Sequence, residues 1–84
     1  MHPLPLESTL LASVSYDRRR HLLEVEFRTG ERYRYFHVPS ACYQGLLRAN
    51  SKGSYFNHNI RNCFLYQHLS RRSSPVVLNA TKTK

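Results

Sequence analysis

Apolar residues in the first half of the chain alternate with polar ones, and this pattern predicts β-strands. The intervening residues are serines over 12–16 and glutamates over 23–27, and this period of two is typical of strands with one buried face. Asp17 and the three arginines that follow it supply a turn between these strands. A second turn at 29–30 leads into a third strand over 32–36. We therefore expect a three-stranded antiparallel meander.

The length of the second turn decides where Tyr33 and Tyr35 point. A two-residue turn would mix polar and apolar side chains on each face, because a slip of one residue inverts the faces. A three-residue turn with Gly30 in the left-handed conformation separates them, and it sets Glu26 opposite Arg34 as a cross-strand pair of opposite charge. We therefore expect both tyrosines to point towards the core. Core packing is thus favoured over a second interpretation, in which the two rings stack on nucleic-acid bases.

Two helices are predicted after the strands. Pro39 stands at the start of the first, where its missing N–H costs nothing, and Gly53 is a suitable residue to end it. Ser54 can cap the second helix, which we expect to run to about Gln67. Apolar residues recur at three- and four-residue spacing and predict the buried stripes: Cys42, Tyr43, Leu46 and Leu47 in the first helix, and Phe56, Ile60, Cys63 and Phe64 in the second. The predicted fold is α+β, a three-stranded antiparallel β-meander followed by two helices packed on one face of the sheet.

The two ends of the chain are expected to lie outside this domain. Residues 1–9 hold two prolines and no periodicity, which indicates a flexible leader. Residues 69–84 mix charge, proline and small polar residues, which predicts a disordered basic tail. The α+β domain then spans 10–68. Glu7 interrupts the apolar stretch near the amino terminus, and no apolar run approaches about eighteen residues, so we expect no signal peptide, no membrane span and a cytoplasmic location.

The charge of the chain is strongly positive. Thirteen lysines and arginines stand against five acidic residues, which gives a net charge of +8 and a sequence pI of about 10.1. Ten of the thirteen cations are arginines, whose planar guanidinium suits phosphate. Between residues 10 and 66 there are nine cations and four acids, so the folded part shares the excess with the tail. A basic surface of this kind concentrates polyanions.

The cysteines and histidines do not predict a metal site or a cofactor. Cys42 and Cys63 lie twenty-one positions apart without a second pair, and no histidine has the spacing of a zinc finger. We expect both cysteines to be buried thiols in a reducing compartment.

The segments from 13 to 66, taken in order, resemble a KTSC domain, the short module named for its occurrence at the carboxyl end of some lysyl-tRNA synthetases. The matching residues are Val14-Ser15-Tyr16-Asp17, Leu23-Glu24-Val25-Glu26-Phe27 with Gly30, the central Tyr33-Arg34-Tyr35, Val38-Pro39, Tyr43, Leu46, Ala49, Ser51-Lys52-Gly53-Ser54-Tyr55-Phe56-Asn57 and Ile60-Arg61. Each segment is short, but all of them occur in sequence order. The resemblance implies RNA binding, through the attachment of the module to a synthetase, and it supplies no catalytic residues.

Five residues around the start of the second helix are predicted to hold a phosphate. Lys52, Gly53 and Ser54 join the two helices and expose backbone N–H groups there, and a helix start favours an anion. Asn57 and Arg61 are one helical turn apart and hence on one face of the same helix. A structural alternative stays open: Gly53 and Ser54 then only end and cap helices, and Arg61 braces a helix carbonyl or a strand glutamate.

The first turn supplies a second candidate contact. Arg18, Arg19 and Arg20 repel one another in a tight turn, and a phosphate backbone would relieve that repulsion. The alternative is three solvated charges. We call these three residues the arginine rail.

Two other functional classes stay open. A metal-independent nuclease of the acid–base kind would use His37, His58, Tyr55 and Arg61. However, no Asp or Glu follows Glu31 in the sequence to orient a histidine or hold a metal. A protein-interaction module would act through the free sheet face, with an exposed apolar patch around Phe36, Leu22 and Leu65 as its sign. The sequence favours a non-catalytic module that binds RNA, with tRNA among the candidates.

Overall fold

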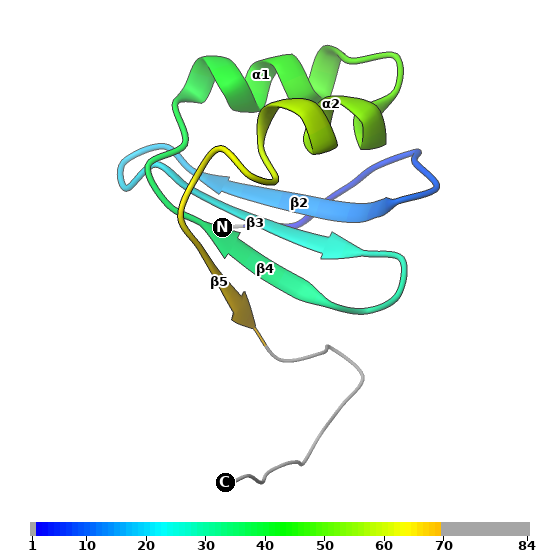
Figure 1. Ribbon diagram of the computed structural model, residues 1–84, viewed down its shortest axis with the longest axis horizontal. Helices are drawn as coiled ribbons and strands as arrows, with labels where there is room; N and C mark the ends of the chain where they lie inside the picture. Colours follow the sequence, from blue (N-terminus) through cyan, green and yellow to red (C-terminus); the bar gives the residue numbers. More distant parts are fainter. Residues whose placement is uncertain (1, 70–84) are drawn as a thin grey trace, which may run out of the picture.

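The computed structural model describes residues 2–69, which form one antiparallel sheet with two helices over one of its faces (Figure 1). The five strands lie side by side in sequence order: β1 (Leu4–Pro5), β2 (Leu11–Asp17), β3 (Leu22–Phe27), β4 (Arg32–Tyr35) and β5 (Tyr66–Leu69). The helices are α1 (Ser40–Arg48) and α2 (Lys52–Asn59). The α+β class and the two helices are confirmed, whereas the prediction of three strands is wrong because the sheet has five.

The first additional strand, β1, lies in the segment predicted to be a flexible leader. Leu4 pairs with Val14, and the N–H of Leu6 donates to the carbonyl of Ala12 at 3.0 Å. The Leu6 side chain is buried in the core. A two-residue strand is too short to show alternation, so the sequence pattern gives no sign of it.

The second additional strand, β5, occupies the segment predicted as the end of the second helix. Helix α2 ends at Asn59, and the chain then returns to the sheet, where Tyr66 pairs with Tyr35 of β4. The helical spacing of Ile60 and Phe64 misled the prediction, because a turn that packs on a core can place apolar residues at the same spacing. Cys63 lies in this turn and is exposed, so the prediction that it is buried is also wrong.

The register between β3 and β4 differs by two residues from the predicted one. The turn has three residues, with Gly30 at φ 95°, and the N–H of Phe27 donates to the carbonyl of Glu31 at 2.9 Å. The turn thus occupies residues 28–30, whereas the predicted pairing of Glu26 with Arg34 requires a turn at 29–31. Arg34 therefore pairs with Glu24 and not with Glu26, and its Nη2 lies 2.7 Å from the Glu24 carboxylate. A shift of two residues leaves every side chain on its predicted face. Alternation alone does not distinguish these two registers.

The junction between the helices also differs from the prediction. Ser51, not Ser54, caps α2: its Oγ accepts a hydrogen bond from the Ser54 N–H at 3.2 Å. Gly53 lies inside the first turn of α2 and does not end α1, whose last residue is Arg48. A side chain at Gly53 would have its Cβ 3.2 Å from Cβ of Leu10, so glycine here permits the close approach of α2 to the segment before β2.

The core lies between the sheet and the helices. Its buried side chains are Leu6, Leu11, Val14, Leu23, Val25, Phe27, Tyr35, Val38, Leu46, Phe56 and Ile60. Tyr35 is only 3% exposed, while Tyr33 is half-buried at the edge of the core. Among residues 2–69, no helix has the length and apolar character needed to cross a membrane. Of the predicted tail, residues 70–84 lie outside the described part of the chain.

Candidate nucleic-acid interface

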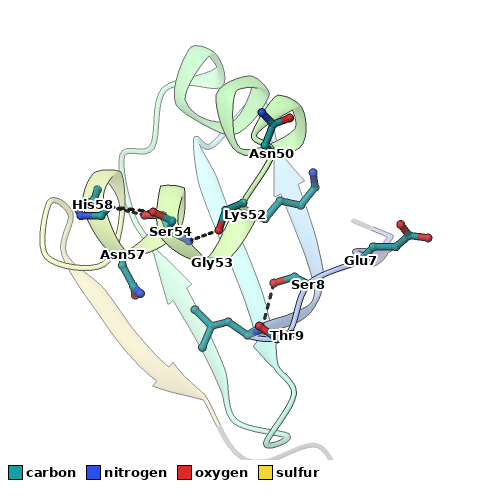
Figure 2. Close-up of a pocket in the computed structure, with 11 residues that line it drawn as sticks. Glu7, Ser8, Thr9, Asn50, Lys52, Gly53, Ser54, Asn57 and His58 are labelled. Atoms are coloured by element: carbon teal, nitrogen blue, oxygen red, sulfur yellow. Dashed lines mark hydrogen bonds between the residues drawn. The ribbon is translucent and has the colours of Figure 1, made fainter.

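The start of α2 faces the segment before β2 across an open cleft of about 810 Å³ (Figure 2). One wall consists of residues 7–10, and the other of residues 50–54 together with Asn57 and His58. Four of the five residues predicted to hold a phosphate thus come together here: Lys52, Gly53, Ser54 and Asn57. In Figure 2 the carboxylate of Glu7, the acidic residue of the lining, points away from α2.

Some polar groups of the cleft make structural hydrogen bonds, and others have no acceptor within their helix. Nζ of Lys52 donates to the carbonyl of Ala49 at 2.9 Å, which engages one of the three donors of the ammonium. Nδ1 of His58 lies 2.8 Å from the Ser54 carbonyl. The N–H groups of Lys52 and Gly53 belong to the first turn of α2, where an α-helix supplies no intrahelical acceptor. These amides carry the positive end of the helix dipole.

Arg61, the fifth predicted residue, does not line this cleft. Because α2 ends at Asn59, the helical spacing that would place Arg61 beside Asn57 does not apply. Its guanidinium carbon lies 5.7 Å from the ring centre of Phe27 and 5.6 Å from that of Phe56, within the range of cation–π contacts. Arg61 instead borders two smaller hollows, of about 220 and 270 Å³.

The 220 Å³ hollow is lined mainly by aromatic residues. The ring centroid of Tyr33 lies 5.6 Å from that of Tyr66, which also lines the hollow, and 4.8 Å from that of His68, which does not. Tyr66 is 57% exposed. Burial raises the pKa of Tyr35, at the inner wall, to about 12, although the nearby charge of Arg61 acts in the opposite direction. We call Tyr33, Tyr66 and His68 the β5 cluster. Sequence reasoning missed it because it depends on β5.

The arginine rail forms an exposed turn between β2 and β3. Oδ1 of Asp17 accepts hydrogen bonds from the N–H groups of Arg19 and Arg20, at 3.0 and 3.3 Å, which fixes the backbone of the turn. The Arg20 side chain is 77% exposed, and its Nε lies 3.9 Å from the Asp17 carboxylate. The rail lies at the end of β2, whereas the cleft lies beside the start of β2, so the two zones are at opposite ends of this strand (Figure 1).

The residues considered for catalysis are distributed over different elements. His37, with φ 60°, lies in the link between β4 and α1 and does not line the cleft that holds His58. Tyr55 donates from its hydroxyl to the carbonyl of Cys42 at 3.0 Å. Within the described residues, no group of three or more His, Cys, Asp or Glu side chains is arranged to hold a metal ion.

The fold and these surfaces define a small α+β module with a polar cleft at one helix start. The KTSC domain family matches residues 7–64, and the chain therefore belongs to this family. It is 46% identical to an uncharacterised protein of Stutzerimonas stutzeri over 57 residues, which cover 68% of this chain and 80% of that protein. A crystal structure of a KTSC domain protein from Yersinia pestis superimposes with a TM-score of 0.80 at 32% identity, covering 82% of this chain and 97% of that one.

The chain also resembles one part of a longer enzyme. It is 36% identical to the lysine–tRNA ligase of Nostoc punctiforme over 64 residues, which cover 76% of this chain and only 11% of the ligase. The chain thus spans about a tenth of the length of that relative.

Proposed function

We propose that this chain is a non-catalytic module that binds RNA, with tRNA as one candidate, and that it acts in the cytoplasm. The observation that carries the proposal is the cleft at the start of α2, where Lys52, Gly53, Ser54 and Asn57 line one wall. First-turn amides, an ammonium and a side-chain amide are groups that contact phosphate oxygens in nucleic-acid complexes. The two free thiols, Cys42 and Cys63, are in keeping with a reducing compartment.

The arginine rail gives the proposal a second contact zone. Three consecutive arginines are exposed on a turn whose backbone is held by Asp17. Such charges attract a phosphate backbone without reading its sequence, because the interaction depends on the release of counterions. We therefore propose that the rail raises the affinity for any RNA, and that the cleft positions one phosphate.

The name of one relative favours RNA among the polyanions. The match lies within an enzyme whose name describes a ligase for lysine and tRNA. A small basic module attached to such an enzyme is well placed to hold tRNA, and the same surface in a separate chain would keep that capacity. This is the reason for proposing RNA before DNA.

Binding is tested by fluorescence anisotropy with tRNA, single-stranded RNA and duplex DNA at several salt concentrations. Lys52→Ala should weaken RNA binding at low salt because it removes a charge from the cleft. Arg48→Ala is the matched control: Arg48 is exposed at the end of α1, does not line the cleft, and carries the same charge. Equal effects of the two substitutions would leave only a general charge effect, and RNA binding as weak as that of a neutral protein would refute the proposal.

The same samples test the absence of catalysis. Labelled RNA incubated with the protein should stay intact with chelator and equally with added magnesium. Cleavage that His58→Ala or His37→Ala abolishes, and that Arg48→Ala does not, would instead identify a metal-independent nuclease.

One observation favours a second candidate, a protein-interaction module. Leu65 is 73% exposed, and its carbonyl accepts the N–H of Phe36 at 2.9 Å, so these two apolar residues are neighbours. Leu22 is partly exposed at the adjoining end of β3. If Leu65→Ser abolished the capture of a specific protein from a lysate while RNA binding stayed weak, the apolar surface would be the functional one.

A further inference from the structure

The β5 cluster exposes a large aromatic surface beside a cation, and no part of the phosphate cleft accounts for it. Tyr66 is 57% exposed, and it is the aromatic residue among the three large apolar side chains that are exposed in residues 2–69, the others being Leu4 and Leu65. The ring of Tyr66 is tilted by 56° to that of Tyr33 and by 38° to that of Tyr35. Tyr33 and Tyr35 stack on each other, with ring centroids 6.4 Å apart and an interplanar angle of 30°, so the ring of Tyr66 is the one that lies tilted to both. All three rings line the hollow of about 220 Å³.

The size and the lining of this hollow restrict its occupant. Pockets for drug-sized ligands have volumes of about 300–1,000 Å³, so this one suits a single planar ring system. It is lined by four aromatic residues together with Arg61 and Asn62; the aromatic residues are Phe27, Tyr33, Tyr35 and Tyr66. An occupant matched to these residue types has a flat aromatic face, hydrogen-bonding groups on its edge and a negative charge nearby.

We propose that the β5 cluster binds one unstacked nucleobase of an RNA strand, with the ring against Tyr66 and Tyr33. Aromatic side chains on sheets hold splayed bases in this way, because every base has a π-face. The side-chain amide of Asn62 hydrogen-bonds the edge of the base, and the guanidinium of Arg61 contacts the adjoining phosphate. The inference deepens the proposed function and rests on it, since it names the part of the RNA that this surface takes.

The charges around the cluster determine on which side the phosphate lies. Arg61 stands over Phe27 and Phe56, so both ring contacts hold its guanidinium beside the hollow. The carboxylate of Glu31, which Nε2 of His68 contacts, is not part of the lining of the hollow, and Arg61 is the charged residue of that lining. The phosphate of the bound nucleotide is therefore expected on the Arg61 side.

The test compares two probes of equal length and charge: a single-stranded oligoadenylate and an abasic oligonucleotide that keeps the phosphates and lacks the bases. The full chain should bind oligoadenylate more tightly than the abasic strand. Tyr66→Leu should weaken oligoadenylate binding by roughly 5- to 160-fold, the effect of replacing one aromatic side chain that stacks on a base, and should leave abasic binding unchanged. Tyr66→Phe keeps the ring and should retain the preference for bases.

The controls separate this inference from the proposed function. Leu65→Ala alters a neighbouring exposed side chain that does not line the hollow, so it should leave both affinities as they are. Because Tyr66 is exposed, Tyr66→Leu is expected to fold, and its circular dichroism and melting temperature are measured first. Equal binding of both probes by the wild-type chain, or a preference for bases that survives Tyr66→Leu, would overturn the inference alone. If the chain bound neither probe, both this inference and the proposed function would be overturned.

Discussion

Several polar side chains of this domain have a structural contact and lie on a candidate binding surface at the same time. Lys52 donates a hydrogen bond to the carbonyl of Ala49, just after the end of α1, and also lines the cleft at the start of α2. Arg61 packs over Phe27 and Phe56 while it borders the aromatic hollow. Substitution of either residue therefore changes stability as well as binding, and each binding assay needs a stability measurement beside it.

Tyr35 and Tyr66 face each other across β4 and β5 but should differ sharply in their contribution to stability. Tyr35 is 3% exposed, so Tyr35→Ala should lower the free energy of unfolding by about 3–5 kcal/mol, as for other buried aromatic residues. Tyr66→Ala removes a ring that is 57% exposed and should cost clearly less. Urea denaturation of both variants measures the difference. Equal losses would mean that β5 holds Tyr66 in the core.

The raised pKa of Tyr35 predicts a loss of stability at high pH. Its hydroxyl ionises near pH 12 in the folded chain because burial disfavours the charged form, and near about pH 10 when unfolded. Below about pH 10 both states keep the proton and stability is full; from there to about pH 12 only the unfolded chain loses it, so stability falls. Denaturation at several pH values should show a smaller fall for Tyr35→Phe. An unchanged fall would contradict the assignment to Tyr35.

At the scale of the elements, the sequence predicted which face of the sheet each side chain occupies better than it predicted where strands and helices begin and end. Alternation placed the side chains of β3 and β4 on their correct faces, because burial of one face is a strong signal. It did not determine the register, since the Glu24–Arg34 and Glu26–Arg34 pairings both keep the same faces. β1 and β5 were missed because pairing with a neighbouring strand, and not local pattern, makes these short segments into strands.

The capping of α2 gives a test at this scale. Oγ of Ser51 accepts the N–H of Ser54, so Ser51→Ala should destabilise the domain by about 0.5–2 kcal/mol. The hydroxyl of Ser54 is exposed and only contacts Nδ1 of His58 at 3.3 Å, so Ser54→Ala should change stability by less than about 0.5 kcal/mol. Thermal unfolding of the two variants measures both losses of stability. A larger loss for Ser54→Ala would restore Ser54 as the cap.

For the whole molecule, the candidate site was predictable where it is local in sequence. Lys52, Gly53, Ser54 and Asn57 fall within six residues, and all four line the cleft at the start of α2, while their binding of a phosphate stays a prediction. Arg61 was grouped with them through a helix that ends too early. The β5 cluster combines rings from two strands whose pairing depends on the entire fold, so no local pattern reveals it.

The arginine rail should act on affinity for all RNA sequences alike. Replacing Arg18, Arg19 or Arg20 singly by Ala removes one screened charge, so the slope of log affinity against log salt should fall by about one. Affinities for unrelated single-stranded sequences should fall by the same factor. Anisotropy titrations at several salt concentrations measure both quantities. A loss of affinity for only one RNA sequence would instead indicate that the rail recognises bases.

Direct mapping of the RNA contacts by NMR tests the central claim that this chain binds RNA through these surfaces. The full chain labelled with nitrogen-15 is titrated with single-stranded RNA, and the amide shifts are followed residue by residue. We expect the largest changes at Lys52, Gly53 and Ser54 in the cleft, at Arg18–Arg20 in the rail, and around Tyr66 in β5. Changes confined to Leu22, Phe36 and Leu65, or no saturable change in residues 2–69, would contradict the account.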